Sequence, residues 1–147
     1  MMYSTSKVSD LTQIEEIVRK TFTGDTSLFE TYHFINNNEE AAIADTLANI
    51  TSIMNEADAE FYQFECDGKV IGYINTIQRQ NLLYSFGVNK SYRNDDVKRC
   101  FVETIDSMFD KDYMVYLYSK NTRAINFMCN NGFEEQEVRL LTKKKKK

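Results

Sequence analysis

Charged residues gather in the segment SYRNDDVKRCF, residues 91–101, directly after a run of apolar residues. Four basic residues lie in it or next to it: Lys90, Arg93, Lys98 and Arg99. Asp95 and Asp96 are acidic, so four positive and two negative charges leave a local balance of +2. A helix that begins here would offer unpaired N–H groups and the positive end of its dipole, which attract anions such as phosphate. The alternative is that Asn94 or Asp95 is an ordinary N-cap, with the aspartates favourable toward the dipole.

The neighbouring elements place this helix start beside the end of a strand. Residues 82–88, LLYSFGV, are nearly all apolar, which is typical of a strand buried on both faces. Apolar residues then recur at helical spacing: Val97, Phe101, Ile105 and Met108. Residues 113–118 are predicted to form another strand, and residues 121–131 a helix that Gly132 ends with a left-handed C-cap. Ligands of α/β proteins usually bind at the carboxyl ends of such strands.

The first part of the chain predicts one strand and two helices. Residues 3–7 form the candidate strand, and a capping box that begins at Asp10 predicts a helix that runs to about Gly24. An irregular stretch follows. A second cap at Asn37 then predicts another helix, which is marked by apolar residues at helical spacing: Ile43, Leu47, Ile50 and Met54.

A hairpin and a closing strand complete the predicted sheet. Residues 61–66 and 69–77 are rich in β-forming side chains and flank Asp67-Gly68, a strong signal for a two-residue turn. Residues 133–142 are expected to form the last strand. The predicted order is βααβββαβαβ, an α/β fold with a mixed, mostly antiparallel sheet flanked by helices.

Composition favours one globular domain over residues 1–142, followed by a lysine-rich tail at residues 143–147. No apolar run reaches the roughly 18 residues that cross a bilayer, and the first residues lack the apolar core of a signal peptide. We therefore expect a cytoplasmic protein without a membrane partner. The net charge of −4 argues against a nucleic-acid module, which would have to rely on the lysine tail. The oligomeric state is left open, with a homodimer among the alternatives.

Cysteine spacing indicates no redox or metal chemistry. The three cysteines, Cys66, Cys100 and Cys129, are widely spaced, and none of them belongs to a CxxC pair. Neither a disulfide framework nor a zinc site is suggested by this pattern. We expect reduced, buried thiols and no bound metal.

The order of elements, together with YRNDDVKR after FGV and NTRAINFMCNNGF near the end, resembles the GCN5-related N-acetyltransferase family. In that family a central strand ends in a valine a few residues before the signature (Q/R)xxGx(G/A). The backbone N–H groups of the signature bind the pyrophosphate of acetyl-CoA. A later segment of the form NxxAxxxYxxxGF completes the cofactor site. The element order resembles the family over the whole chain, whereas the motifs lie in residues 82–133.

The first motif matches the family at two positions and departs from it at two others. Arg93 matches the basic start and Val97 the apolar position. Asp96 replaces a glycine, and Lys98 replaces a glycine or alanine. Glycines there let backbone amides approach phosphate oxygens, so the Asp96 carboxylate adds both bulk and repulsion. The resemblance implies that the pyrophosphate binds along residues 93–99: Arg93, Asn94, Asp95, Asp96, Val97, Lys98 and Arg99.

The second motif fits the family except at the tyrosine position, which Met128 occupies. The matching residues are Asn121, Ala124, Gly132 and Phe133. That tyrosine often protonates the departing CoA thiolate, and methionine has no proton to give. The alternative for this segment is an ordinary capped helix with a core stripe: Ile125, Met128 and Cys129.

The resemblance implies direct transfer of an acetyl or other acyl group from acyl-CoA to an amine. Asn121 would face the pantetheine arm and Phe127 the CoA side, while the main chain of Phe86 to Val88 would bind the arm and polarise the thioester carbonyl. The acceptor would be an amine-bearing small molecule or protein. The catalytic residues are not identified, and three candidates for the base rest on chemistry alone: Tyr84, Ser85 and His33. The alternative function is a catalytically silent domain of the same fold that binds a ligand or a protein partner.

Overall fold

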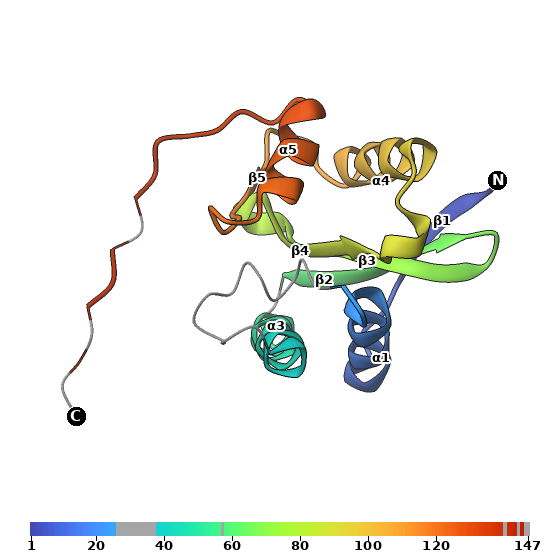
Figure 1. Ribbon diagram of the computed structural model, residues 1–147, viewed down its shortest axis with the longest axis horizontal. Coiled ribbons are helices and arrows are strands. Elements are labelled where there is room, and N and C mark those ends of the chain that lie inside the picture. Colours follow the sequence, from blue (N-terminus) through green and yellow to red (C-terminus); the bar gives the residue numbers. More distant parts are fainter. Residues whose placement is uncertain (26–37, 57, 140, 144, 146–147) are drawn as a thin grey trace.

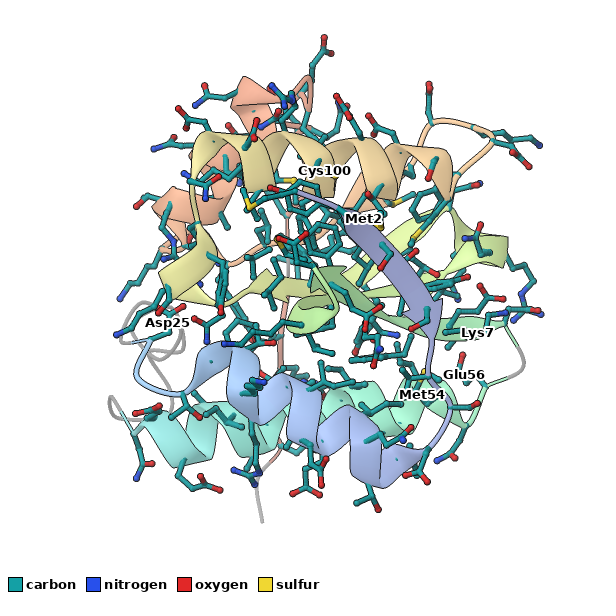
Figure 2. The ribbon with its side chains drawn as sticks, turned by 90° about the vertical axis from the view of Figure 1, so that its right-hand side faces the viewer. Met2, Lys7, Asp25, Met54, Glu56 and Cys100 are labelled. Atoms are coloured by element: carbon teal, nitrogen blue, oxygen red, sulfur yellow. The ribbon has the colours of Figure 1, made fainter. Side chains whose placement is uncertain are left out.

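The computed structural model describes residues 1–25, 38–56, 58–139, 141–143 and 145. A five-stranded sheet, ordered β1-β2-β3-β4-β5, has helices on both faces (Figure 1). Helices α1 (Leu11–Phe22) and α3 (Glu39–Met54) lie against one face. Helices α4 (Asp95–Ser107) and α5 (Thr122–Asn130) lie on the other side (Figures 1 and 2). The predicted α/β class with a mixed, mostly antiparallel sheet is confirmed.

The strands pair antiparallel in chain order except for the last pair. They are β1 (Tyr3–Lys7), β2 (Ala59–Cys66), β3 (Lys69–Ile77), β4 (Leu82–Val88) and β5 (Met114–Val115). Asp67 and Gly68 form the predicted hairpin turn, because both have a positive φ, of 51° and 80°. Strand β5 runs parallel to β4 and pairs only with Leu82 and Leu83.

Two predicted strands differ from the structure. The strand predicted over residues 113–118 contains only Met114–Val115. The closing strand predicted over residues 133–142 is wrong, because the described residues of this range belong to no strand. A two-residue β5 offers a short edge for pairing, and the acidic residues that open the segment are poor β-formers. Figure 1 shows this part of the chain leading away from the sheet after α5.

Side chains cap the helices largely where the sequence places them. Asp10 Oδ1 accepts hydrogen bonds from two amides of the first turn of α1, although α1 ends at Phe22 rather than near Gly24. The cap of α3 is Asn38, whose side chain accepts a bond from the Ala41 amide at 2.9 Å. The predicted cap at Asn37 is therefore one residue too early, and Asn37 itself lies outside the described residues.

Gly132 ends α5 in the left-handed conformation that the sequence predicts, with a φ of 96°. The amide of Phe133 donates to the Met128 carbonyl at 3.1 Å, and the amide of Gly132 donates to the Cys129 carbonyl at 3.3 Å. These two bonds define a Schellman motif. The cap turns the chain so that Phe133 packs against the core beside Met128.

Each face of the sheet has its own hydrophobic core. Phe64, Phe101 and Met128 belong to the core under α4 and α5, and Ile14 and Tyr73 belong to the core under α1 and α3. The cysteines are all free thiols, but only Cys66 is buried, whereas Cys100 is half-buried and Cys129 is exposed. The expectation of buried thiols is thus wrong for Cys129. In the described part of the chain, no helix is long and apolar enough to cross a bilayer, and no side-chain cluster suits a metal ion.

Candidate cofactor and active site

A bulge in β4 opens the sheet beside β5. Ser85 pairs with Asn75 and Leu83 pairs with Thr76, so Tyr84 is an extra residue in β4. Such a bulge bends its strand, and it lies where the pairing of β4 with β5 ends. Among the described residues, the backbone of residues 84–87 makes no hydrogen bond toward the β5 side. Polar backbone groups here can therefore bind a ligand that lies between the two strands.

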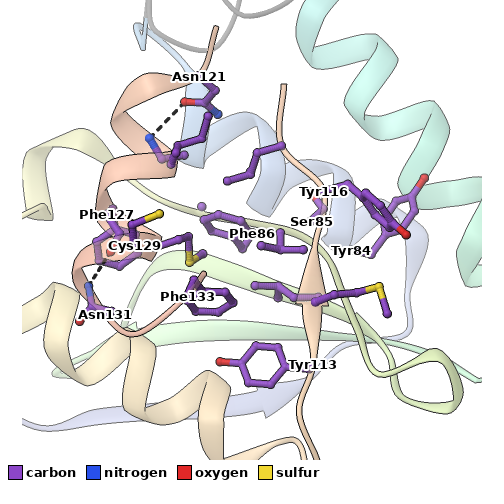
Figure 3. A pocket seen from close by; sticks show the side chains of 18 of the residues that line it. Tyr84, Ser85, Phe86, Tyr113, Tyr116, Asn121, Phe127, Cys129, Asn131 and Phe133 are labelled. Carbon is purple, nitrogen blue, oxygen red and sulfur yellow. Dashed lines mark hydrogen bonds between the residues drawn. The ribbon is translucent and has the colours of Figure 1, made fainter. Parts of the chain in front are cut away.

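A cleft of about 1910 Å³ occupies this opening and continues along α5. Figure 3 shows Phe86 of β4 and Phe127 of α5 on the wall nearest α5, and Tyr84 and Tyr116 together toward α3. Eight of the eleven predicted cofactor-binding residues line the cleft: Phe86, Val88, Arg93, Asp95, Lys98, Arg99, Asn121 and Phe127. The other three, Asn94, Asp96 and Val97, do not line it.

The start of α4 is capped by its own side chains. Asn94 Oδ1 accepts a hydrogen bond from the Val97 amide at 2.9 Å, and the Val97 side chain is buried in the core. Asp96 Oδ1 accepts a bond from Arg99 at 2.6 Å. The N-cap alternative is therefore confirmed for Asn94. One amide of this helix start already has a partner, and one of its cations is paired with an aspartate.

Arg93 is held inside the protein rather than facing solvent. Its Nε donates to the Val88 carbonyl at 2.8 Å, and its Nη2 donates to the carboxylate of Asp25. The Asp25 and Arg93 side chains are only 4% and 16% exposed. Arg123 Nη2, at the start of α5, lies 3.6 Å from the same Asp25 oxygen. Two arginines therefore share one buried carboxylate at the side of the cleft.

Sequence reasoning did not identify Asp25 and Arg123. Arg123 lies inside the NTRAINF segment, between two motif residues, and that position was the available signal. Asp25 lies 68 residues before Arg93, and no local pattern links the two.

Other side chains of the turn after β4 hold the end of α1. Lys90 Nζ donates to the Gly24 carbonyl at 2.6 Å, and Asn89 Nδ2 donates to the Lys20 carbonyl at 2.9 Å. Cations and donors are favourable at a helix C-terminus, where carbonyls lack helical partners. Lys90 is thereby engaged with a backbone carbonyl, so the local charge of +2 is only partly available to a ligand.

Two residues of the second motif, Asn121 and Met128, have the roles expected in an ordinary capped helix with a core stripe. Asn121 Oδ1 accepts a bond from the Ala124 amide at 3.3 Å and so caps α5 (Figure 3). Met128 is 2% exposed and packs in the core, although part of it also lines the cleft. Cys129 is exposed and does not belong to a core stripe. Phe127 is half-buried beside the cleft.

Two tyrosines near the cleft have a raised pKa. Burial, followed by the charges of Asp45 and Glu56, raises the pKa of Tyr84. Burial, followed by Asp45, raises the pKa of Tyr118. Phenols with a raised pKa keep their protons at neutral pH, so neither is a good base.

The other two candidates for the catalytic base are Ser85 and His33. Ser85 Oγ lies 2.7 Å from the hydroxyl of Tyr73, and either oxygen could be the donor. His33 lies outside the described residues.

The mixed, mostly antiparallel sheet with helices on both faces is the fold that the resemblance to the GCN5-related N-acetyltransferases implies, and comparison with solved acetyltransferase structures confirms this fold. No known family model matches the sequence, and no curated protein matches it either. The structural similarity to PaiA N-acetyltransferase from Thermoplasma acidophilum, solved with coenzyme A, covers 95% of this chain and 94% of that one, with a TM-score of 0.60 and 20% identity.

Two further structures show the same architecture. An aminoglycoside antibiotic 6′-N-acetyltransferase from Acinetobacter baumannii matches 99% of this chain and 100% of its own, with a TM-score of 0.65 and 12% identity. YjaB from Escherichia coli, solved in its apo form, matches 91% of this chain and 84% of its own, with a TM-score of 0.64 and 19% identity. At these identities the similarity shows the fold alone.

Proposed function

We propose that this protein is a cytoplasmic N-acyltransferase that moves an acetyl or related acyl group from acyl-CoA to an amine. The observation that carries this proposal is the opening of the sheet at the Tyr84 bulge, which leaves backbone groups beside the cleft. Phe86 and Phe127 supply apolar walls for the pantetheine arm. A solved protein of the same fold holds coenzyme A.

The chemistry is acyl transfer in one displacement. The neutral amine attacks the thioester carbon, and backbone N–H groups of residues 86–88 stabilise the negative charge that develops on the carbonyl oxygen. The C–S bond breaks, the nitrogen gives up one proton to water, and the leaving thiolate takes up one proton. Met128 cannot supply that proton, whereas Tyr84 and Tyr118 hold theirs at neutral pH. The net charge of −4 favours an acceptor that carries positive charge.

The second candidate is a catalytically silent domain of the same fold. The Asn94 side chain occupies the Val97 amide, and Asp95 and Asp96 bring two carboxylates to the first turn of α4. Met128 removes the hydroxyl that the family motif supplies at this position. A domain of this kind would bind a ligand or a protein partner in the same cleft without turnover.

Release of free CoA thiol from acetyl-CoA tests the proposal. The panel of acceptors includes a polyamine, an aminoglycoside and a lysine-containing peptide, each assayed with and without the protein. Because Cys129 is exposed, a blank with protein alone corrects for its own thiols. Thiol release that depends on one of the acceptors supports the enzyme. Saturable CoA binding without release on any acceptor supports the silent domain, and the absence of both binding and release contradicts the enzyme.

A further inference from the structure

Two arginines and one aspartate form a compact cluster where α1 ends, β4 ends and α5 begins. Asp25 Oδ2 accepts a bond from Arg93 and lies 3.6 Å from Arg123 Nη2. Among the described residues, this cluster of two guanidinium groups and one carboxylate has a net charge of +1. Arg93 is fixed on its other side by the Val88 carbonyl. Asp25 therefore orients one arginine and draws the second one toward it.

Arg123 is the member of the cluster whose guanidinium is exposed to a ligand in the cleft. Its side chain is 53% exposed, and it lines the cleft next to Asn121. A guanidinium has five N–H donors in a planar fork that matches phosphate oxygens. Burial and the nearby charge of Arg93 lower the pKa of Arg123. An anion beside Arg123 would relieve this repulsion between the two cations.

The start of α4 is a poorer place for the same anion. A phosphate there would meet Asp95 and Asp96, the second of which already binds Arg99. The Val97 amide is also taken by Asn94. At the cluster, by contrast, the one carboxylate is only 4% exposed and is shared by two arginines. Electrostatics thus favours the cluster over the helix start.

We propose that Arg123, with Arg93 beside it, is the main cation for the pyrophosphate of coenzyme A in this protein, in place of the start of α4. Asp25 is then a positioning residue that sets the geometry of both arginines. The assignment of the ligand rests on the proposed function. The existence of an anion site at the cluster does not.

Calorimetry with the full chain tests the ligand assignment. Arg123→Gln should weaken binding of CoA by about tenfold or more, as expected when a charge-assisted hydrogen bond is lost. Arg123→Gln should weaken binding of dephospho-CoA, which lacks the 3′-phosphate, by the same factor. The matched control is Arg79→Gln, because Arg79 pairs with Asp58 away from the cleft. This variant should bind CoA and dephospho-CoA within about twofold of the parent affinities. Unchanged CoA affinity in Arg123→Gln would overturn the proposal, as would a loss confined to CoA and absent for dephospho-CoA.

Inorganic pyrophosphate separates this inference from the proposed function. It should raise the melting temperature of the parent and of Arg79→Gln, but not that of Arg123→Gln. Asp25→Asn should show a smaller rise than the parent, because both arginines lose the carboxylate that sets their geometry. A loss of stability alone would leave that rise unchanged. Failure of the parent to bind CoA, with these pyrophosphate results intact, would reject the proposed function and keep the anion site. A tenfold gain in CoA or pyrophosphate affinity from Asp96→Gly, with no loss from Arg123→Gln, would place the anion at α4 instead.

Discussion

The carboxylate of Asp25 accepts a hydrogen bond from Arg93 and ties the end of α1 to the turn between β4 and α4. Figure 2 shows Asp25 at this end of α1. Both side chains are largely buried, so the ion pair is shielded from water and from salt. The wall of the cleft at Val88 therefore depends on a contact between residues far apart in the chain.

Asp25→Asn should lower the free energy of unfolding by about 3 kcal/mol, because it leaves the buried Arg93 guanidinium without its counter-charge. Urea denaturation at neutral pH measures this. Asp58→Asn is the matched control, since Asp58 forms an exposed ion pair with Arg79, and it should cost less than about 1 kcal/mol. Equal losses in the two variants would show that the Asp25 contact has no special role in stability.

Gly72 of β3 lies against the backbone of β4. A Cβ atom at Gly72 would stand 2.2 Å from the Gly87 carbonyl oxygen, and only a backbone shift could relieve that contact. Gly72→Ala should therefore cost about 2 to 3 kcal/mol of unfolding free energy. A Cβ atom at Gly132 would have no neighbour within 4 Å, so only the positive φ opposes Gly132→Ala. This substitution should cost about 1 kcal/mol of unfolding free energy. A smaller cost at Gly72 than at Gly132 in urea denaturation would contradict this ranking.

Met128 holds the position at which the family motif has tyrosine, and its side chain lies between the core and the cleft. Met128→Tyr should raise turnover by about tenfold or more if thiolate protonation limits the rate. Overpacking should lower stability by about 1 to 3 kcal/mol. Met128→Phe adds the same ring without the hydroxyl, so it should share the stability cost and show no gain. A similar rate in both variants, under conditions where chemistry limits turnover, would exclude Met128 as the missing proton donor.

Alkaline pH should destabilise the fold through its tyrosines. Burial raises the pKa of Tyr84 and of Tyr118 above the value of about 10 that an unfolded chain has. The folded state therefore retains protons that the unfolded chain releases, so this contribution is complete below about pH 10 and declines as pH rises through the folded pKa values. Urea denaturation should give a lower free energy of unfolding at pH 11 than at pH 8. The difference should be smaller in Tyr84→Phe. An equally steep fall in that variant would mean that Tyr84 does not contribute.

Local signals explain most of what the sequence predicts correctly. The Asp67-Gly68 turn, the Asn94 cap and the Gly132 cap each depend on residues within a few positions of one another, so the chain pattern contains the whole cause. The opening of the sheet beside β4 is not predicted from the sequence. The bulge at Tyr84, which makes that opening, depends on the register with β3 and has no signal in β4 alone.

Contacts between distant segments explain what the sequence does not predict. The closing strand was expected from its own residues, but a strand also needs a neighbour, and β5 offers only Met114–Val115. The pairing of Arg93 with Asp25 likewise depends on how α1 packs on the sheet. The resemblance assigns Arg93 to a ligand, because it rests on a local motif that carries no information about the buried partner, Asp25.

The most direct test of the central claim is calorimetric titration of CoA into variants that fill the cleft. Ala124 lines the cleft on α5, whereas its neighbour Thr122 is exposed and does not line it. We expect the parent and Thr122→Trp to bind one CoA per chain with similar affinity, and Ala124→Trp, once its fold is verified by circular dichroism, to bind at least about tenfold more weakly because the indole occupies the ligand's space. Absence of CoA binding by the parent, or equal affinity in Ala124→Trp, would contradict an acyl-CoA site in this cleft.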